Sequence, residues 1–312
     1  MRIAALAGLA GCTLLLMAPG GASAQDDKSW ETCISTAGSG ATRLPACTAV
    51  IDAKSVTGRK LAGAYCIRGN DLTEKGELDA ALADLNVAIS IDASYACAYV
   101  NRGRVYTLKR DYDRAIQDYD AAIKHDATMA LAYNNRGDAW ILKGDFDRAI
   151  ADLSEAIRLN PTYAKAFANR GLAYYRKRDH AHAIEDYSTE IRIAANLMSY
   201  IDRGNAYRDS EQLDRAAADY AMVIKLAPKD ARGWRNRGLI RLFKGDHKGA
   251  VADYDKALAY DPADVSSWNN RGQAKVRSGD RKGGIADLRK ALELQPDLKT
   301  TREALQKLGA AP

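Results

Sequence analysis

The dipeptide Arg-Gly recurs along this chain at nearly constant intervals. It stands at Arg68-Gly69, Arg102-Gly103, Arg136-Gly137, Arg170-Gly171, Arg203-Gly204, Arg237-Gly238 and Arg271-Gly272. Successive pairs are 34 residues apart, with one interval of 33. A fixed period of this length is typical of a solenoid, in which each unit packs only against its neighbours. The 312 residues therefore predict one elongated repeat body rather than several globular domains.

Each repeat divides into two helical halves. In the third copy, residues 130–143 are rich in helix formers, Gly144 supplies a left-handed stop, and Asp145 can cap a second helix that runs to about Leu159. No stretch alternates polar and apolar residues over the length of a strand, so we expect an all-α fold. The expected repeats are residues 62–95, 96–129, 130–163, 164–196, 197–230, 231–264 and 265–298.

Two further segments flank the repeats. Residues 25–61 read as an N-terminal helical cap, because they contain a degenerate copy of the repeat. Residues 299–312 read as a C-terminal capping helix and tail, in which Leu298, Leu305 and Leu308 share one side.

An aromatic residue stands four positions before the glycine of every copy. On a helix these two positions share a face, so a large ring lies next to a position without a side chain. Glycine in mid-helix costs about 1 kcal/mol relative to alanine, and its recurrence therefore indicates a close approach of two helices. The rings are predicted to be core residues rather than a ligand cage; they are Tyr65, Tyr99, Tyr133, Phe167, Tyr200, Trp234 and Trp268.

The order of these residues resembles the tetratricopeptide repeat family. In the third copy Tyr133, Gly137, Trp140, Ala149 and Pro161 carry the resemblance. It implies antiparallel helix pairs stacked into a right-handed superhelical solenoid of seven repeats, whose first helices line a concave groove. Members of the family bind peptides or partner proteins in that groove and are rarely catalytic.

One departure from the family pattern predicts a charge ladder. Arginine precedes the glycine in every copy, where the family commonly has leucine, and every second helix carries an aspartate. We expect the arginine and the aspartate of each repeat to pair. An exposed pair contributes only about 0–1 kcal/mol, so such a ladder would set register more than stability. The aspartates are Asp84, Asp118, Asp152, Asp186, Asp219, Asp253 and Asp287.

The fourth copy is irregular. It is one residue short, its junction has no proline, and Glu190 occupies a position that is alanine in most other copies. A buried carboxylate is costly. We therefore predict a looser or bent junction between Ile193 and Met198, which is a candidate hinge.

Residues 1–24 read as a secretory signal peptide. Arg2 gives a positive start, an apolar stretch follows, and Ala22-Ser23-Ala24 is a small-residue cleavage signal, so cleavage is expected after Ala24. The alternative is a lipoprotein signal that ends at Cys12. The apolar run is shorter than the roughly 20 residues of a membrane span, so no span is expected. These features predict a periplasmic or secreted protein.

Four cysteines remain after removal of this leader, and an oxidising compartment permits bridges between them. The spacing favours a disulfide between Cys33 and Cys47. Cys66 and Cys97 form either a second bridge or a pair of buried thiols, because geometry decides between the two. No Cys-x-x-Cys spacing supports a zinc or dithiol site.

Catalysis, cofactors and nucleic acid find no support in the sequence. His180 and His182 are the only close histidine pair, and residues two apart on a helix point to different faces. The formal net charge of +6 is a weak excess over 312 residues and falls short of the clustered basic field of a nucleic-acid binder.

The groove implied by the resemblance is the candidate site. Its first-helix residues include basic, aromatic and carboxamide side chains, which suit an acidic segment or a chain terminus as ligand. The alternative is that these side chains are hydrated and bind no ligand. The carboxylate clamp known in the family is not reproduced in any three consecutive copies. The candidate groove residues are Asn135, Lys165, Asn169, Tyr175, Arg208, Arg232, Arg235 and Asn236.

We therefore expect a non-catalytic adaptor or scaffold of the bacterial cell envelope, which binds a protein or peptide. One alternative is a permanent accessory subunit of an envelope complex, which would display a large apolar outer patch. Another is an enzyme or metal carrier, which would need a converging polar pocket. The sequence does not determine the oligomeric state.

Overall fold

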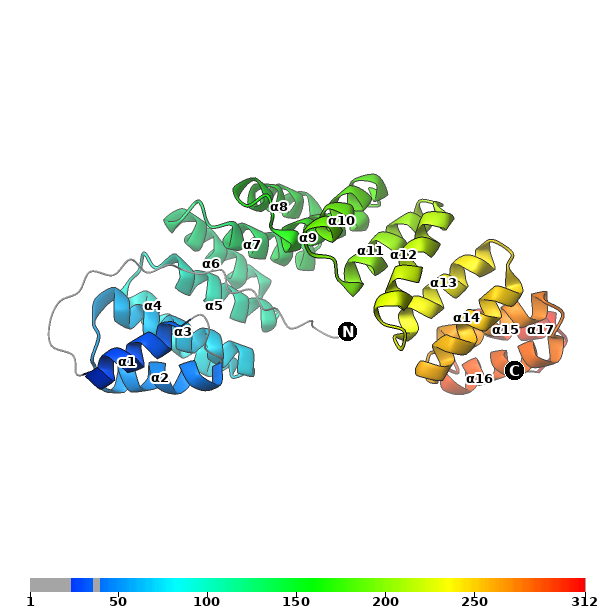
Figure 1. Cartoon of the computed structure of the whole chain (residues 1–312), viewed down its shortest axis with the longest axis horizontal. Coiled ribbons are helices and arrows are strands. Elements are labelled where there is room, and N and C mark those ends of the chain that lie inside the picture. The colour runs from blue at the N-terminus through cyan, green and yellow to red at the C-terminus, as the bar shows by residue number, and fades with distance from the viewer. Residues whose placement is uncertain (1–23, 36–39, 312) are drawn as a thin grey trace. The chain divides into compact units, whose positions relative to one another are not determined.

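The computed structural model describes residues 24–35 and 40–311, which form seventeen α-helices and no strand. The expected all-α fold is confirmed (Figure 1). The helices gather into two compact units, and the division between them in the sequence falls within α9 (Ala164–Arg176). The first unit ends at Asn169 and the second begins at Arg170.

In the first unit, consecutive helices pack against one another as hairpins. The strongest packing joins α3 to α4, α5 to α6 and α7 to α8, which are the two halves of successive repeats. Its helices before α9 are α1 (Ala24–Ile34), α2 (Gly40–Asp52), α3 (Gly58–Lys75), α4 (Leu78–Ile91), α5 (Ala96–Leu108), α6 (Tyr112–His125), α7 (Ala130–Lys143) and α8 (Phe146–Leu159).

The second unit repeats this arrangement and ends in a single helix, α17. Leu305 of α17 is buried against Leu288 and Leu292 of α16, with Leu298 and Leu308 packed around them. The helix thus covers the apolar end of the stack. The helices after α9 are α10 (His180–Ala194), α11 (Leu197–Asp209), α12 (Leu213–Leu226), α13 (Ala231–Phe243), α14 (His247–Tyr260), α15 (Val265–Arg277), α16 (Arg281–Leu294) and α17 (Lys299–Lys307).

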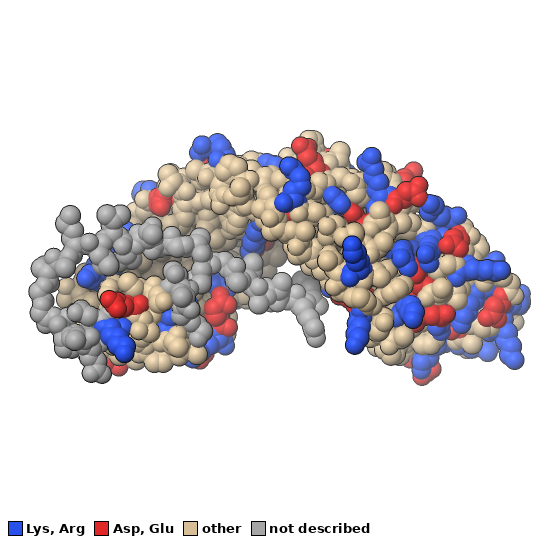
Figure 2. All heavy atoms as spheres, viewed as in Figure 1, with Lys and Arg blue, Asp and Glu red and all other residues tan. Residues whose placement is uncertain are grey.

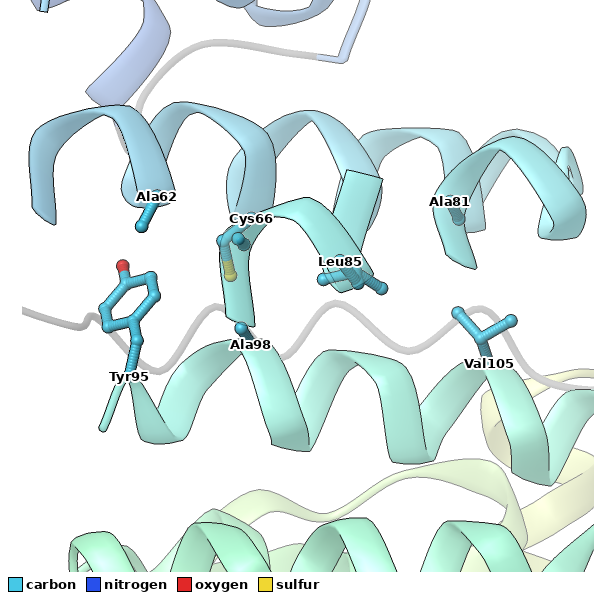
Figure 3. Close-up of a cluster of buried hydrophobic side chains, with 8 residues drawn as sticks. Ala62, Cys66, Ala81, Leu85, Tyr95, Ala98 and Val105 are labelled. Carbon is cyan, nitrogen blue, oxygen red and sulfur yellow. The ribbon is translucent and has the colours of Figure 1, made fainter. Parts of the chain in front are cut away.

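The repeated glycines lie where two helices approach closely, as predicted. A Cβ added to Gly137 of α7 would lie 2.7 Å from Cγ of Leu153 on α8, and one added to Gly103 would lie 2.7 Å from the ring of Tyr119. The facing side chain is therefore a leucine or tyrosine of the second helix. Figure 3 shows one such core, in which side chains of α3, α4 and α5 point toward one another.

Helix ends follow the punctuation in the sequence. Gly144 ends α7 in the left-handed region, with φ of 84°, and its N–H group bonds back to the helix. The Asp145 side chain then accepts a hydrogen bond from the backbone N–H of Arg148 and caps α8.

The predicted charge ladder is confirmed in all seven repeats. Each arginine donates from Nε and Nη2 to the two carboxylate oxygens of its aspartate, at 2.6 to 2.9 Å. The aspartates are buried, so these pairs are not the exposed case considered above. The guanidinium also lies over the aromatic ring three residues before it, as at Arg271, which is 4.6 Å from the centre of the Trp268 ring.

The junction after Ile193 contains hydrogen bonds that stabilise the buried Glu190. Glu190 is buried, at 6% exposure, but its carboxylate accepts hydrogen bonds from Ser199 Oγ at 2.7 Å and Asn196 Nδ2 at 3.1 Å. Asn196 also caps α11 through the N–H groups of Met198 and Ser199. These hydrogen bonds offset the cost of burying Glu190, and α10 packs directly on α11, while the bend between Ile193 and Met198 stays a prediction.

The disulfide predicted between Cys33 and Cys47 is present and joins α1 to α2. Cys66 is a buried free thiol, so a bridge between Cys66 and Cys97 is wrong and the buried-thiol alternative holds for Cys66. Burial raises the pKa of the Cys66 thiol to about 12, against a hydrogen bond donated by Asn101. The predicted signal peptide and Cys12 lie outside the described residues. None of the described helices has the length and apolar character needed to cross a membrane.

Candidate functional site

Residues one period apart lie side by side on neighbouring first helices. In the first unit Arg104 of α5 donates to Asn70 of α3, at 3.2 Å. In the second unit Arg232 of α13 donates to the sulfur of Met198 on α11, at 3.0 Å. The first helices of each unit therefore present aligned rows of side chains, and the candidate residues divide between the two units.

Three candidates lie in the first unit, and two of these are joined through a buried residue that the sequence did not single out. Asn134 is fully buried; its Nδ2 donates to Oδ1 of Asn135, and its Oδ1 accepts from Nδ2 of Asn169, both at 3.1 Å. This chain of amides connects α7 to α9. Part of the hydrogen-bonding capacity of Asn135 and Asn169 is therefore used inside the protein.

The third candidate, Lys165, faces an opposite charge. Burial lowers the pKa of Lys165, and the negative charge of Asp138 on α7 opposes that change. Burial likewise raises the pKa of Asp138, against the positive charge of Lys165. The two groups form a partly buried, complementary pair, and sequence reasoning missed Asp138.

Tyr175 and Arg208 of the second unit share one carboxylate. The Tyr175 hydroxyl donates to Oδ2 of Asp209 at 2.5 Å, and Nε of Arg208 donates to Oδ1 at 2.7 Å. Beside them is an open hollow of about 480 Å³, lined by Tyr175, Arg176, Arg178, His180 and Asp209. Its polar lining is already internally bonded at Asp209.

Arg232 and Arg235 also pair with carboxylates of the protein itself. Arg232 donates from Nε and Nη2 to the carboxylate of Asp230, and Arg235 Nη1 is 3.5 Å from Oδ2 of Asp264. Sequence reasoning expected these guanidinium groups to be available for a carboxylate ligand. Their acidic partners come from the turns before α13 and α15, so only part of that capacity remains.

Asp202 on α11 lies close to both Arg232 and Glu190. The pKa of Asp202 on α11 is raised to about 6, mainly by burial and then by the negative charge of Glu190, while Arg232 opposes the change. Burial also raises the pKa of Glu190. A proton is thus retained on Asp202 at a higher pH than on an ordinary aspartate.

Comparison with protein families explains the repeated geometry. A family model described as TPR repeat matches residues 69–109, 137–177 and 240–279, and one described as tetratricopeptide repeat matches residues 98–128, 199–230 and 265–298. Together they span more than half of the chain. The chain belongs to the tetratricopeptide repeat (TPR) family.

Solved TPR structures share this fold at low sequence identity. A Cytophaga hutchinsonii protein, described as the C-terminal part of a TPR repeat-containing protein, has a TM-score of 0.63 and 19% identity over 77% of this chain and 99% of that chain. PilW has a TM-score of 0.60 and 14% identity, over 67% of this chain and 98% of that chain. YrrB has a TM-score of 0.53 and 21% identity, over 60% of this chain and 97% of that chain. No curated protein matches the sequence.

Two further residues lie on first helices of the sixth and seventh TPR repeats, on the face that carries the candidate residues. We call this first-helix surface the candidate face, and sequence reasoning missed both residues. Phe243 is 58% exposed at the end of α13, and Arg277 is exposed at the end of α15. The signal was present in the period, because the fifth residue after the Arg-Gly glycine is phenylalanine in this copy alone. The side chain of Asn236, a predicted candidate on α13, makes no hydrogen bond to other residues of the described part.

The histidine pair behaves as helix-face reasoning predicts. His182 bonds to Asp179 at 2.7 Å and stacks on Tyr174, whereas the His180 ring packs edge-on against Tyr175. Within residues 24–35 and 40–311, no group of three His, Cys, Asp or Glu side chains could hold a metal ion.

Proposed function

We propose that this TPR protein is a non-catalytic adaptor or scaffold of the bacterial cell envelope, which binds a peptide or protein segment on its first-helix faces. The observation that carries the proposal is the aligned rows of polar side chains on those helices. Some of them, such as Asn236, keep amide donors and acceptors available for another main chain. YrrB, which shares the fold, is described as having an unusual peptide-binding site.

An envelope location is supported by two observations. The Cys33–Cys47 disulfide favours an oxidising compartment. PilW, another protein with this fold, is described as a type IV pilus biogenesis factor. Together with the leader expected over residues 1–24, these observations favour export over a cytoplasmic role.

One observation favours the second candidate function, a permanent accessory subunit. Leu226, Tyr260 and Leu294 end α12, α14 and α16, stand one period apart and are 39% to 53% exposed. They form an apolar row on second helices, away from the first-helix faces. A stable complex that survives dilution would favour this function over a reversible adaptor.

The test is capture of envelope proteins on the mature chain, residues 25–312, and on the double variant Arg232→Glu, Arg235→Glu. The matched control is Lys225→Glu, Lys256→Glu, which reverses the same number of charges on exposed second-helix positions. We expect the first variant to lose specific partners and the control to retain them. Equal recovery of every partner by all three proteins would remove the groove from the proposal.

A further inference from the structure

Phe243 has the largest exposed fraction among the exposed large apolar side chains of the described residues, at 58%. The corresponding position is Asp209 one period earlier and Arg277 one period later. Neighbouring first helices hold such residues side by side, and α13 contacts α15 directly. Phe243 therefore stands between a carboxylate and a guanidinium on the first-helix face of the second unit.

The two flanking charges are not equivalent. The Asp209 carboxylate is bonded by both Arg208 and Tyr175, so its charge is largely compensated. The Arg277 side chain is exposed and makes no ion pair or hydrogen bond with any residue in the described part of the chain. The available charge beside Phe243 is therefore positive. This contrasts with Arg232 and Arg235, whose acidic partners are already in place.

Carboxamide groups lie on α13, the helix of Phe243, and on the neighbouring first helix, α15. Leu239 precedes Phe243 by one turn and is partly buried, Gln273 stands one period after Leu239, and Asn236 lies one turn before Leu239. The side chains of Asn236 and Gln273 have no hydrogen-bond partner in the described residues. A carboxamide can both donate to and accept from an extended main chain. We call Asn236, Leu239, Phe243, Gln273 and Arg277 the Phe243 patch.

The wider field has the same sign as Arg277. The excess of basic over acidic residues falls in residues 170–312, whereas the two types nearly balance before residue 170. Figure 2 shows lysine and arginine side chains gathered over the end formed by α13–α17. Such a field raises the rate of encounter with an acidic partner.

We propose that the Phe243 patch binds an extended polypeptide segment in which an apolar side chain stands next to an aspartate or glutamate. The apolar side chain packs on Phe243 and Leu239, the acidic side chain pairs with Arg277, and the carboxamides bond the main chain. Because Asn236 lies on α13 and Gln273 on α15, the bonded main chain runs from one first helix to the next, and the segment continues through the patch rather than ending there. This inference rests on the proposed function and names the partner's chemistry.

The test is fluorescence anisotropy with dye-labelled synthetic peptides and the mature chain. The parent peptide is a Gly-Ser sequence with a central leucine followed by a glutamate, and its C-terminus is amidated. Its analogues replace the glutamate by glutamine, replace the leucine by serine, or move the carboxylate to a free C-terminus. We expect the parent to bind, and each analogue to bind at least about tenfold more weakly, which corresponds to about 1.4 kcal/mol.

Protein variants then assign the effect. Phe243→Ala should weaken the parent about tenfold, whereas the control Val87→Ala, at an exposed second-helix position of α4, should not change binding. Arg277→Gln should weaken the parent but leave the glutamine analogue unchanged, whereas the control Lys248→Gln should leave both unchanged. Both test residues are exposed, so thermal unfolding should match the unaltered protein and show that the variants fold.

Three results overturn the inference. They are parent binding that is unaffected by Phe243→Ala, an equal effect of Arg277→Gln on the acidic and amide peptides, and binding only of peptides with a free C-terminal carboxylate. Failure of every peptide to bind the unaltered protein also overturns it. The capture experiment with Arg232 and Arg235 decides the proposed function independently of these outcomes.

Discussion

Arg203 donates from Nε and Nη2 to both oxygens of Asp219, at 2.8 and 2.7 Å, and so joins α11 to α12 within one repeat. Nη1 of the same arginine donates to Ser188 Oγ at 3.1 Å, which joins this repeat to α10 of the preceding one. A single guanidinium thus fixes both the hairpin and its stacking. The same two-way link recurs at Arg136, which bonds Asp152 and Asp120.

Replacement of Asp219 should therefore destabilise the second unit. Asp219 is 4% exposed, and Asp219→Ala would leave a partly buried guanidinium without its carboxylate. Because the Arg203 side chain keeps some contact with water, we expect a loss of about 1–3 kcal/mol in the free energy of unfolding. Urea denaturation measures it. Asp214→Ala is the matched control, since that exposed carboxylate pairs only with Lys244 at the surface and should cost less than about 1 kcal/mol.

The close approach at Gly137 gives a second prediction. Alanine favours helix over glycine by about 1 kcal/mol, but the added methyl group would meet Leu153 at 2.7 Å. We expect the clash to win and Gly137→Ala to lower the free energy of unfolding by about 1–3 kcal/mol. The double variant Gly137→Ala, Leu153→Ala should then be less destabilised than the sum of the two single variants. Additive losses would show that the two helices do not meet at this glycine.

The period predicted most of the fold, because each repeat contains its own packing parts. Gly137, Gly144 and the Arg136–Asp152 rung could all be identified from spacing alone, since their partners lie within the same 34 residues. The N-terminal cap has no such period. Its buried ion pair between Arg43 and Asp71 joins α2 to α3 and was not expected from the sequence.

The candidate face was harder to predict because its chemistry depends on partners from other segments. Arg232 and Arg235 were expected to be available, but Asp230 and Asp264 occupy them from the neighbouring turns. The cost of burying Glu190 was expected to loosen its junction, but its carboxylate has hydrogen-bond donors from the next helix and the turn before it. The groove was predicted from basic, amide and tyrosine side chains, and that prediction did not include the apolar Phe243.

Removal of the Cys33–Cys47 bridge gives a third prediction. The two cysteines are 14 residues apart, and both are buried where α1 packs on α2. Closing a loop of this size restricts the unfolded chain, so Cys33→Ser, Cys47→Ser should reduce the stability of this cap by about 3 kcal/mol. Hydrogen exchange of α1 and α2 measures the change locally. Exchange in α13–α16 provides the internal control and should remain unchanged.

The buried acidic groups of Asp202 and Glu190 predict a pH dependence of stability. The pKa of Asp202 is about 6 in the folded protein, above the value of about 4 expected for an unfolded aspartate. The folded state therefore binds more protons than the unfolded state between about pH 4 and pH 6, so the contribution of Asp202 to stability falls as pH rises through this window. Glu190 acts in the same direction, because burial raises its pKa as well. Asp202→Asn should flatten the fall in the free energy of unfolding measured from pH 4 to pH 7. Asp214→Asn is the matched control for replacing an aspartate at an exposed position. An identical slope in the unaltered protein and Asp202→Asn would show that Asp202 does not retain its proton.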